Sequence, residues 1–491
     1  MTYRLLETTV AACLIISASA ARYPYPTQNI SIENLFGPYL SPGVEIASST
    51  DSNFSSVVTA RWTSWDAPTW IGAIKPATEN DVQEIVKIAS ANGISFLATN
   101  GGHGAGIGYA NISGIDINLS SFNTVSIDVG RNELTVGAGV LIGDLIQPLY
   151  DAGLAVPHGN EECVGMIGAT LGGGIGIGTG VLGLGVDSLK SVRLVTAAGN
   201  LVTASSTSHP WLFWATRGAG ANFGIILSAT FELQNQINDG NTVQGSFIFA
   251  GADNSSVFEL YKSFDEDLPD ELAITLGLSY NQTSQTSEIL LNYYYFGPQS
   301  EAQPYLDAVE ALSPLTSSIS VLTAPELYQG LENGECTTGA PLSGGTLGIG
   351  ETDIPTLQAV FADLVEFSQA NPTTYIGQSV FQRYSNSRAL QVSSCSTSYP
   401  WRDIRAFWLH LNVFLSPELE DASANLTLSM RSKLQATSGF SSPHIYVNYA
   451  YGDEGPAAWW SAANLPRLRL LKALWDPKHL FGMANPIPAW A

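Results

Sequence analysis

The sequence predicts an α+β protein whose second domain is built on an antiparallel sheet with helices on one face. In the N-terminal half, glycine clusters separate short strands and helices, and these clusters thin out after about residue 238. Beyond that point, strands of alternating polarity such as AITLGLSYN and EILLNYYYF occur with helical segments such as 354–370. Strands and helices with one apolar side each bury it by packing a helix layer on one face of a sheet.

Composition and charge exclude two classes of partner. The chain has 491 residues, of which 45% are hydrophobic and 13% charged, which is typical of a globular protein with two or three domains. Its formal net charge of -23 repels nucleic acid and anionic membrane surfaces. No segment is long and apolar enough to span a bilayer. We therefore expect neither nucleic-acid binding nor a membrane span.

The N-terminus has the pattern of a secretory signal. Arg4 supplies a positive charge, residues 10–16 an apolar core, and residues 18–20 (ASA) a small-residue cleavage site. We therefore expect residues 1–20 to be a signal peptide and the protein to be secreted or to reside in the secretory-pathway lumen. Asn-X-Ser/Thr sequons agree with export, and we expect N-glycans at some of them. These sequons start at Asn29, Asn53, Asn111, Asn118, Asn254, Asn281 and Asn425.

The cysteines predict one disulfide bond and one further thiol. Cys13 lies in the signal, so the exported chain keeps Cys163, Cys336 and Cys395. An odd number leaves one thiol outside any intramolecular pair. Because Cys163 lies inside a glycine-rich region, we expect Cys336 and Cys395 to form the disulfide.

The first glycine-rich loop follows a strand–helix–strand pattern. Thr78 with Asp81 has the spacing of a capping box, the helical repeat ends at residues 92–93, and a strand over 94–98 leads into the loop NGGHG. Glycine runs let backbone N–H groups approach an anion closely. His103 at the centre of the loop is either a functional group or a loop histidine that only forms hydrogen bonds.

The second glycine-rich block does not fit a dinucleotide-binding motif. A helix over 142–150 precedes this block, which spans 165–185, and a strand pair hinged at 198–200 follows it. Residues 178–183 match G-x-G-x-x-G, but neither the strand before nor the helix after is present, and Thr203 stands where an acidic residue is needed. This disfavours a NAD-dependent dehydrogenase. H-E-x-x-H and C-x-x-C are also absent, and we expect no metal site.

Several stretches resemble one known family. IKPATENDVQEIVKIASANGISFLATNGGHG, GMIGATLGGGIG and HPWLFWATRGAGANFGIILSATFEL are similar to the PCMH-type FAD-binding domain of the vanillyl-alcohol-oxidase superfamily. With HIYVNYAYGDEG and LKALWDPKHLFGMANPI, the chain resembles the berberine-bridge-enzyme branch in a fungal-type form. The resemblance implies a two-part PCMH-type FAD-binding domain plus the antiparallel-sheet substrate domain. The expected divisions are a signal peptide (1–20), an N-terminal segment (21–67), the FAD-binding domain (68–237), the substrate domain (238–440) and a C-terminal segment that returns to the FAD domain (441–491).

The resemblance implies a covalently held FAD. In the family, the histidine at the position of His103 is joined to the 8α-methyl group of the flavin. Many relatives add a cysteine link where this sequence has Glu161, and Cys163 lies two residues further along. Two residues of extended chain span roughly 6–7 Å, so we expect a single bond through His103 and none through Cys163. The remaining implied cofactor-binding residues are Asn100, Gly101, Gly102, Gly104, Gly165, Gly168, Leu171, Gly172, Gly173, Gly174, Gly224, Ile225, Ile226 and Asn448.

The strand AFWLHLNVF supplies one candidate catalytic base. Its alternation places Trp408, His410 and Asn412 on the same face. Relatives often carry an acidic or cationic catalytic side chain where Trp408 falls, so that base is missing here. His410 on the same face is a candidate replacement, because its ordinary pKa is near neutrality. The alternative is a hydrogen-bonded histidine beside the core.

The Y-x-N-Y segment supplies the other candidates. The resemblance implies that Asn448 hydrogen bonds the cofactor and that Tyr449 or Tyr446 accepts the substrate's hydroxyl proton. Extended backbone here would point Tyr446 and Asn448 one way and Tyr449 the other. A phenol with the ordinary pKa near 10 needs a nearby cation or a hydrogen bond to the phenolate to act as a base near neutral pH.

The resemblance implies a secreted FAD-dependent oxidoreductase. It would take a hydride from a C–H next to oxygen or nitrogen to flavin N5, with O2 as acceptor. Candidate substrates are a secondary-metabolite alcohol, a precursor of an oxidative cyclisation, or a sugar. The alternative is a covalent-flavin-binding protein without efficient turnover, because a charged base is missing at Trp408.

Overall fold

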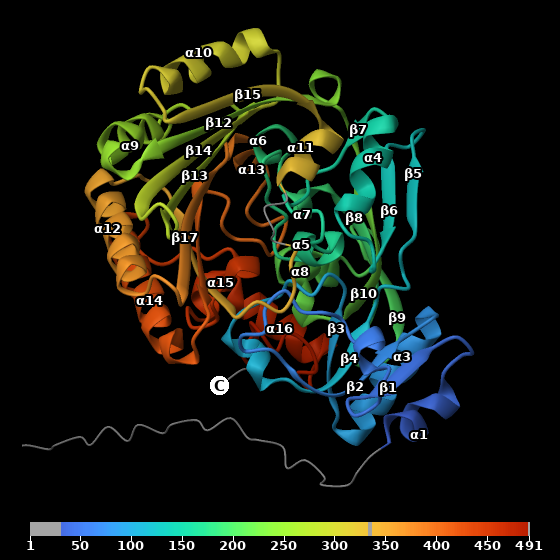
Figure 1. Ribbon diagram of the computed structural model, residues 1–491. Helices are drawn as coiled ribbons and strands as arrows, with labels where there is room; N and C mark the ends of the chain where they lie inside the picture. Colours follow the sequence, from blue (N-terminus) through green and yellow to red (C-terminus); the bar gives the residue numbers. More distant parts are fainter. Residues whose placement is uncertain (1–30, 332–335, 490–491) are drawn as a thin grey trace, which may run out of the picture. The chain divides into compact units, whose positions relative to one another are not determined.

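A computed structural model describes residues 31–331 and 336–489 of the chain (Figure 1). The expected signal peptide and the sequon at Asn29 lie outside these residues. Three main sheets organise the described chain, and one short antiparallel pair, β7 (Leu154–Ala155) with β11 (Gln234–Asn235), joins neighbouring loops. The domain boundaries expected near residues 67, 237 and 440 stay a prediction.

The first sheet has four strands and delivers the chain into the His103 loop. Thr78 accepts a hydrogen bond from the Asp81 N–H and closes the capping box of α3 (Glu79–Asn92), and Gly93 ends the helix at φ 66°. This confirms the helix expected from the sequence. In spatial order the strands are β1 (Glu45–Ser48), β2 (Thr69–Lys75), β4 (Ser113–Asn118) and β3 (Ser95–Thr99). Smaller helices before and after them are α1 (Ile32–Phe36), α2 (Phe54–Val57) and the 3₁₀ turns Gly37–Tyr39 and Ile107–Asn111.

The second sheet has five antiparallel strands and carries the second glycine-rich block on helices. The expected helix near 142–150 is confirmed as α4 (Gly143–Asp151), and the expected strand pair is the hairpin of β8 and β9. In spatial order the strands are β5 (Val125–Asp128), β6 (Glu133–Gly137), β10 (Ile225–Glu232), β8 (Leu189–Val195) and β9 (Leu201–Ser205). The helices are α5 (Met166–Leu171), α6 (Thr179–Leu182), α7 (Gly185–Ser188) and α8 (Pro210–Ala219).

The third sheet confirms the predicted antiparallel sheet with helices on one face. Its seven strands pair only with antiparallel neighbours, and four long helices lie along one side of it (Figure 1). In spatial order the strands are β15 (Thr316–Thr323), β12 (Asn241–Ala250), β14 (Thr286–Tyr295), β13 (Leu272–Asn281), β17 (Tyr375–Arg383), β18 (Ala406–Phe414) and β16 (Leu342–Ile349). The helices are α9 (Asn254–Ser263), α10 (Gln299–Glu310), α12 (Ile354–Ala370) and α14 (Glu420–Thr437), and the shorter α11 (Ala324–Leu331) and α13 (Ser387–Gln391) lie in connections.

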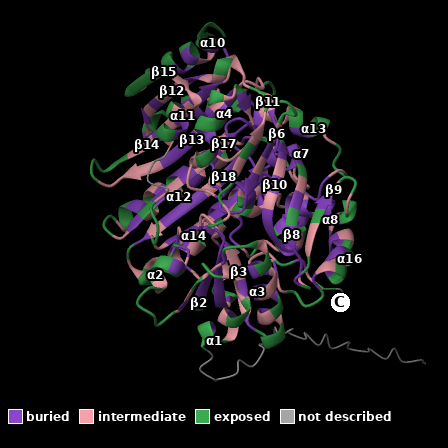
Figure 2. Cartoon of the chain, turned by 90° about the vertical axis from the view of Figure 1, so that its right-hand side faces the viewer, coloured by how far each residue is buried: buried purple, intermediate pink, exposed green. Residues whose placement is uncertain are grey.

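The two faces of this sheet differ in burial. Along β17, buried residues alternate with half-buried or exposed ones, and the sheets form the buried interior of the described chain (Figure 2). Tyr375 and Ser379 belong to the buried set, and the Tyr375 ring contacts Phe367 of α12. Gln378 and Gln382 belong to the half-buried set on the opposite face. The face without the long helices therefore retains solvent access.

A buried ion pair fixes the C-terminal segment, which contains α15 (Pro456–Trp460) and α16 (Leu465–Trp475). The ammonium of Lys472 donates to a carboxylate oxygen of Asp476 at 2.6 Å, to the carbonyl of Asn222 at 2.8 Å and to the carbonyl of Phe481 at 3.0 Å. Both charged side chains are buried, so the pair needs these extra hydrogen bonds to offset its lost hydration. The segment is thereby bound to the turn that precedes β10.

The predicted Cys336–Cys395 disulfide is wrong. The bond joins Cys163 to Cys336, which are 173 positions apart, and Cys395 is an exposed free thiol. The prediction failed because the loop before β16 returns to the glycine-rich part of the chain, which no local pattern in the sequence indicates. Cys395 instead lies on the surface, where its carbonyl accepts a hydrogen bond from the Trp214 indole.

Candidate functional site

The His103 loop is held between two other segments at distances that exclude side chains. A Cβ atom on Gly101 would lie 2.5 Å from the carbonyl oxygen of Cys163. A Cβ atom on Gly102, at φ +72°, would lie 2.1 Å from the carbonyl oxygen of Ala60. Both distances are far below ordinary contact, so glycine is required at these positions. The loop is therefore clamped, with the His103 side chain as its one large group.

The surroundings of His103 favour a neutral imidazole. Its ring stacks on Trp62 with centroids 5.6 Å apart and planes 22° apart. Burial and the nearby positive charge of Arg61 lower the pKa of His103 to about 4. Arg61 also donates to the carbonyl of Gly104 and lies over the Tyr109 ring. At neutral pH the imidazole consequently keeps a lone pair on one ring nitrogen.

A buried carboxyl lies beneath the loop. Asp116 on β4 accepts a hydrogen bond from the Thr59 N–H at 2.6 Å and another from the Thr99 hydroxyl at 2.5 Å. Burial raises the pKa of Asp116 to about 6, although these hydrogen bonds oppose the rise. Thr59 precedes Arg61, and Thr99 is the last residue of β3 before the loop, so Asp116 holds both segments at their base.

The Y-x-N-Y segment is a 3₁₀ turn over Val447–Tyr449, so the extended backbone expected for it is wrong. No neighbouring strand pairs with it among the described residues, and the backbone N–H groups of Tyr449 and Ala450 donate to carbonyls within the turn instead. The amide of Asn448 donates to the Tyr446 hydroxyl at 2.8 Å, and the rings of Tyr446 and Tyr449 are 4.9 Å apart at 89°. The turn thus brings all three predicted residues together.

This turn lies against the second glycine-rich block. A Cβ atom on Gly172 would be 2.0 Å from Asn448 Oδ1, and one on Gly173 would be 2.8 Å from the Tyr446 ring. The Tyr446 hydroxyl accepts from the Gly174 N–H at 3.3 Å. Burial raises the pKa of Tyr446, so less of it is in the phenolate form near neutral pH than for an ordinary phenol.

Tyr449 reaches the half-buried face of the seven-stranded sheet. Its hydroxyl donates to the side-chain oxygen of Gln382 at 3.2 Å. Gln382 pairs across the sheet with Thr275 on one side and Phe407 on the other, so these residues share that face. Phe407 in turn contacts the Tyr446 ring at 5.8 Å. Direct contacts therefore connect the tyrosine pair to the half-buried face of the sheet, which we call its open face.

His410 lies on the other face. As expected from the alternation, Trp408, His410 and Asn412 share a face of β18, but that face is the one covered by helices, since Asn412 donates to Thr427 of α14. The ring nitrogens of His410 lie 2.8 Å from the Ser379 hydroxyl and 3.0 Å from Asn412 Oδ1, and burial lowers its pKa to about 4. The structure therefore places His410 in a buried polar network and not beside Tyr449.

The other residues expected around a cofactor lie near the same two glycine-rich segments. Asn100 donates to the Val140 carbonyl at 3.0 Å and lies against Gly165. Gly168 is exposed, and a Cβ atom there would meet nothing within 4 Å. Leu171 packs on Gly220. Gly224, Ile225 and Ile226 form the buried start of β10 beside β8.

Two residues in contact with His103 or its loop were missed from the sequence. Arg61 and Trp62 lie in the N-terminal segment, before the expected start of the FAD domain at residue 68. Their tryptophan-rich stretch RWTSW is the one signal that marked them. Sequence spacing cannot show that this stretch folds back onto a loop forty residues later.

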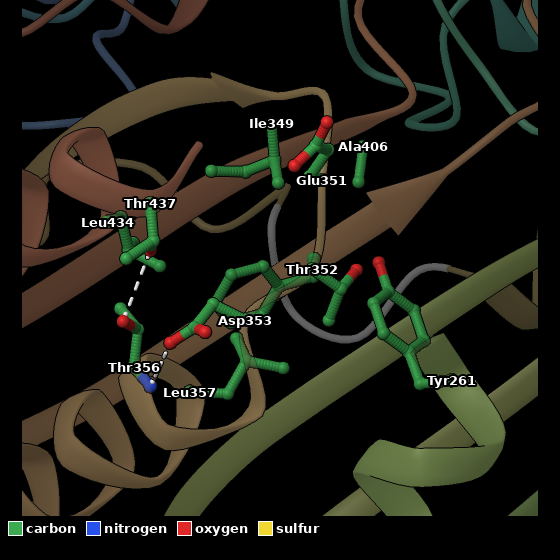
Figure 3. A pocket seen from close by; sticks show the side chains of 11 residues that line it. Tyr261, Ile349, Glu351, Thr352, Asp353, Thr356, Leu357, Ala406, Leu434 and Thr437 are labelled. Atoms are coloured by element: carbon green, nitrogen blue, oxygen red, sulfur yellow. Dashed lines mark hydrogen bonds between the residues drawn. The ribbon is translucent and has the colours of Figure 1, made fainter. Parts of the chain in front are cut away.

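A hollow on the helix-covered side of the sheet is not this site. Residues from α12, α14 and β16 and its following turn line it, together with Tyr261 (Figure 3). Asp353 caps α12 by accepting from the Thr356 N–H, and the Thr437 hydroxyl donates to Thr356. These polar groups serve the local structure.

The described residues offer neither a metal-binding cluster nor a membrane-spanning helix. Within residues 31–331 and 336–489, no group of histidine, cysteine, aspartate and glutamate side chains has the arrangement of a metal site. In the same part of the chain, no helix combines the length and hydropathy needed to cross a membrane.

Two family models match the segments of the chain that contain the His103 loop and the Y-x-N-Y turn. A family model described as FAD binding domain matches residues 70–205, and one described as Berberine and berberine like matches residues 445–488. The FAD-linked oxidoreductase afoF of Emericella nidulans is 51% identical over 464 residues, which cover 94% of this chain and 96% of that protein. The FAD-linked oxidoreductase azaL of Aspergillus niger is 46% identical, with 90% and 96% covered.

Solved structures share the fold at low sequence identity. The xylooligosaccharide oxidase from Myceliophthora thermophila, in complex with xylobiose, matches with a TM-score of 0.79 at 23% identity, covering 94% of this chain and 100% of that one. The Physcomitrella patens protein BBE-like 1 matches with a TM-score of 0.82 at 19% identity and the same coverage. The two-part PCMH-type architecture with an antiparallel-sheet domain is thereby confirmed.

Asp116 predicts a pH-dependent stability. A carboxyl that ionises near pH 6 instead of at its ordinary 3.8 binds its proton more tightly in the folded than in the unfolded chain. Its contribution to the free energy of unfolding is present in full below about pH 4 and falls by on the order of 3 kcal/mol as the pH rises through 6. Asp116→Asn cannot ionise at this position, so the melting temperature of wild type, measured from pH 4 to pH 7, should fall relative to that of the variant as the pH rises. Parallel curves would contradict this.

Proposed function

Because the chain belongs to the family of fungal FAD-linked oxidoreductases with a berberine-like C-terminal segment, we propose that it is an exported oxidase that oxidises a neutral small molecule at a C–H next to oxygen or nitrogen. The observation that carries the proposal is the geometry around His103 and Tyr449. A neutral imidazole in a clamped glycine loop and a tyrosine on an open sheet face both belong to the segments that the two family models match.

The residues present fit FAD. Asn448 is exposed although its neighbours in the turn are packed, and Gly168 close by has open space where a side chain would be, which leaves room for a flat ligand. The buried Arg61 Nε has no hydrogen-bond partner among the described residues, and a phosphate oxygen is a suitable acceptor for such a donor. His103, Asn448 and the backbone of the glycine segments would hold the cofactor.

When bound, FAD supplies the redox chemistry by accepting a hydride and returning electrons to O2. The protein's part is to bind and orient the substrate. The half-buried face of the sheet offers Thr275, Asn292, Gln378 and Gln382, whose amides and hydroxyls donate and accept hydrogen bonds without carrying charge. Such a surface favours a neutral hydroxylated or carbonyl-bearing molecule, such as a secondary-metabolite alcohol, a cyclisation precursor or a sugar.

Tyr449, once it has lost its own proton to solvent, is the proposed acceptor of the substrate's hydroxyl proton. Its O–H already points to the Gln382 amide, so its position on the open face is fixed by a hydrogen bond. Rotation of that amide would present an N–H to the phenolate and stabilise it. Tyr446 supports the turn through Asn448 and Gly174 and is too buried to receive the proton directly.

The alternative function, a covalent-flavin-binding protein without efficient turnover, loses its main argument. It rests on the absence of a charged side chain at Trp408, but Trp408 is fully buried on the helix-covered face. A charged group at that position would not reach a substrate on the opposite face. Bleaching of the flavin by an alcohol or sugar without oxygen separates the two functions.

The first prediction concerns flavin attachment. The proposed bond to His103 should leave the flavin in the pellet after acid precipitation of the wild type, whereas His103→Ala should release it to the supernatant. The absorbance of the two fractions measures this. His158→Ala is a matched control, since it removes another half-buried imidazole and should leave the flavin in the pellet. A peptide in which the flavin is attached to a residue other than His103 would contradict a single link through His103.

The second prediction concerns the base. Tyr449→Phe removes the proton acceptor and should slow anaerobic flavin reduction by about 10²–10⁴-fold, with attachment unchanged. Stopped-flow spectroscopy measures the rate. His410 lies on the other face of the sheet. Any effect of His410→Ala should therefore appear in the stability of the protein and not as slower flavin reduction below pH 6–7. Equal reduction rates in wild type and Tyr449→Phe would remove Tyr449 from this role.

The third prediction concerns export. N-glycans belong at exposed sequons, which among the described residues include Asn53, Asn111 and Asn425. Asn118 is buried, and its side-chain nitrogen donates to the Val57 carbonyl at 2.9 Å, so the atom that would carry a glycan is occupied. Glycopeptide mapping of the secreted protein should find glycans on the exposed group and none on Asn118. A glycan on Asn118 would be incompatible with this fold.

A further inference from the structure

We propose that the Cys163–Cys336 disulfide positions His103 for bond formation with the flavin, so that covalent attachment depends on prior oxidation of this cysteine pair. The inference rests on the proposed attachment through His103. It goes beyond that attachment by assigning a positioning role to two cysteines that contact neither the imidazole nor the open face of the sheet in any described interaction.

One half of the disulfide lies directly against the His103 loop. The carbonyl of Cys163 is the atom that a Cβ on Gly101 would meet at 2.5 Å, and the Gly165 N–H lies 3.0 Å from the same point. On its other side, the segment is bound to the start of α4, where the Gly143 N–H donates to the Glu162 carbonyl at 2.9 Å. The position of Cys163 therefore sets one wall of the loop.

The other half is bound to the segment that contacts His103 from the opposite side. Shortly after Cys336, the Gly339 N–H donates to the Arg61 carbonyl at 2.8 Å. The Ser64 N–H donates to the Ala340 carbonyl at 2.9 Å. The chain from Cys336 thus runs alongside residues 61–64 as far as the start of β16.

Residues 61–62 complete a closed circuit of contacts. The Trp62 N–H donates to the Gly102 carbonyl at 3.2 Å, and its indole stacks on the His103 ring. The circuit runs from the His103 loop through Trp62 to residues 339–340, and from Cys336 across the disulfide to Cys163 and back to Gly101. The disulfide is its covalent link, and it joins the two walls that hold the loop.

This circuit matters because attachment needs close alignment. The C–N bond forms as the 8α-methyl carbon and the imidazole each lose a hydrogen, and the two protons and two electrons reduce O2, the acceptor of the proposed oxidase, to H2O2. Misplacing a reacting atom by about 1 Å costs on the order of 100-fold in rate. Without the disulfide, the Cys163 wall and the Trp62 wall would be connected only through their noncovalent contacts with the loop, so their spacing would be less well fixed. Disulfides form in the oxidising secretory pathway, so attachment would be completed there.

The test uses the full chain with Cys163→Ser, Cys336→Ser or both, and Cys395→Ser as the matched control. Cys395 is the exposed free thiol, so its replacement also removes one cysteine but leaves the disulfide and the circuit unchanged. Each protein is expressed with excess riboflavin and precipitated with acid, and the flavin in pellet and supernatant is measured. We expect the Cys395→Ser pellet to match wild type and the disulfide variants to carry flavin that acid releases, with attachment slower by on the order of 100-fold.

The outcomes separate the two proposals. A wild-type pellet without flavin contradicts the proposed attachment itself. Flavin in the wild-type pellet and equally in the disulfide-variant pellets contradicts the positioning role alone. Flavin that stays with the native variants but leaves on acid treatment distinguishes mispositioning from loss of the binding site.

A second measurement covers the case in which the variants do not fold. Flavin-free wild-type chain is incubated with FAD after no treatment, after reduction by a thiol reagent, or after reduction and reoxidation with oxidised glutathione. Attachment should slow in the reduced sample and recover in the reoxidised one, with circular dichroism showing that the fold is retained. Equal rates in the three samples, or a reduced sample that stays slow after the disulfide re-forms, would overturn the inference.

Discussion

The arrangement of the site depends on the close approach of the His103 loop to the backbone on both of its sides. At Gly101 and Gly102 the neighbouring carbonyl oxygens lie where a side chain would begin. This contact fixes the loop through its backbone and leaves one large side chain, His103, to be shaped by its surroundings. Trp62 supplies a flat wall and Arg61 a positive charge, and both effects act on the same imidazole. A side chain in place of either glycine would displace the neighbouring segments, and any change at His103 would follow from that displacement.

The seven-stranded sheet determines which polar residues are available to a substrate. Its helix-covered face contains a network of His410, Asn412, Ser379 and Tyr375, in which hydrogen bonds offset the loss of hydration. Its other face is half-buried and leads through Gln382 to Tyr449. His103 and His410 have similarly lowered pKa values but lie in different surroundings. His103 lies in a glycine-rich loop, and His410 lies inside the core.

Local patterns in the sequence predicted the elements that depend on local interactions. The α3 capping box, the helix over 354–370 and the β8–β9 hairpin all follow from spacing within a few turns of chain, and the structure confirms them. Alternation along β18 also showed correctly that Trp408 and His410 share a face. It could not show which face the helices cover, since a period of two is the same for both faces.

The features that could not be predicted depend on segments far apart in the chain. The partner of Cys336 is 173 positions away, and the contact of Trp62 with His103 joins the N-terminal segment to the FAD domain. The turn at Tyr446 was expected to be extended because its residues favour strands, but it lies against glycine backbone, where a compact turn fits. In this last case the deciding contact is an approach to glycine backbone, whereas the first two are a disulfide and a ring stack, and no local sequence pattern indicates the partner in any of the three.

The charge distribution sets a condition on the chemistry. The chain carries a formal charge of -23, yet central side chains of the open sheet face such as Thr275, Gln382 and Phe407 are uncharged. An anionic substrate would be repelled by the acidic exterior, and these side chains supply no positive charge to pair with it. A neutral substrate is not repelled and finds hydrogen-bonding partners there. In the proposed reaction, the position of Tyr449, held on this face by its hydrogen bond to Gln382, would limit which hydroxyl group of the substrate can lose its proton.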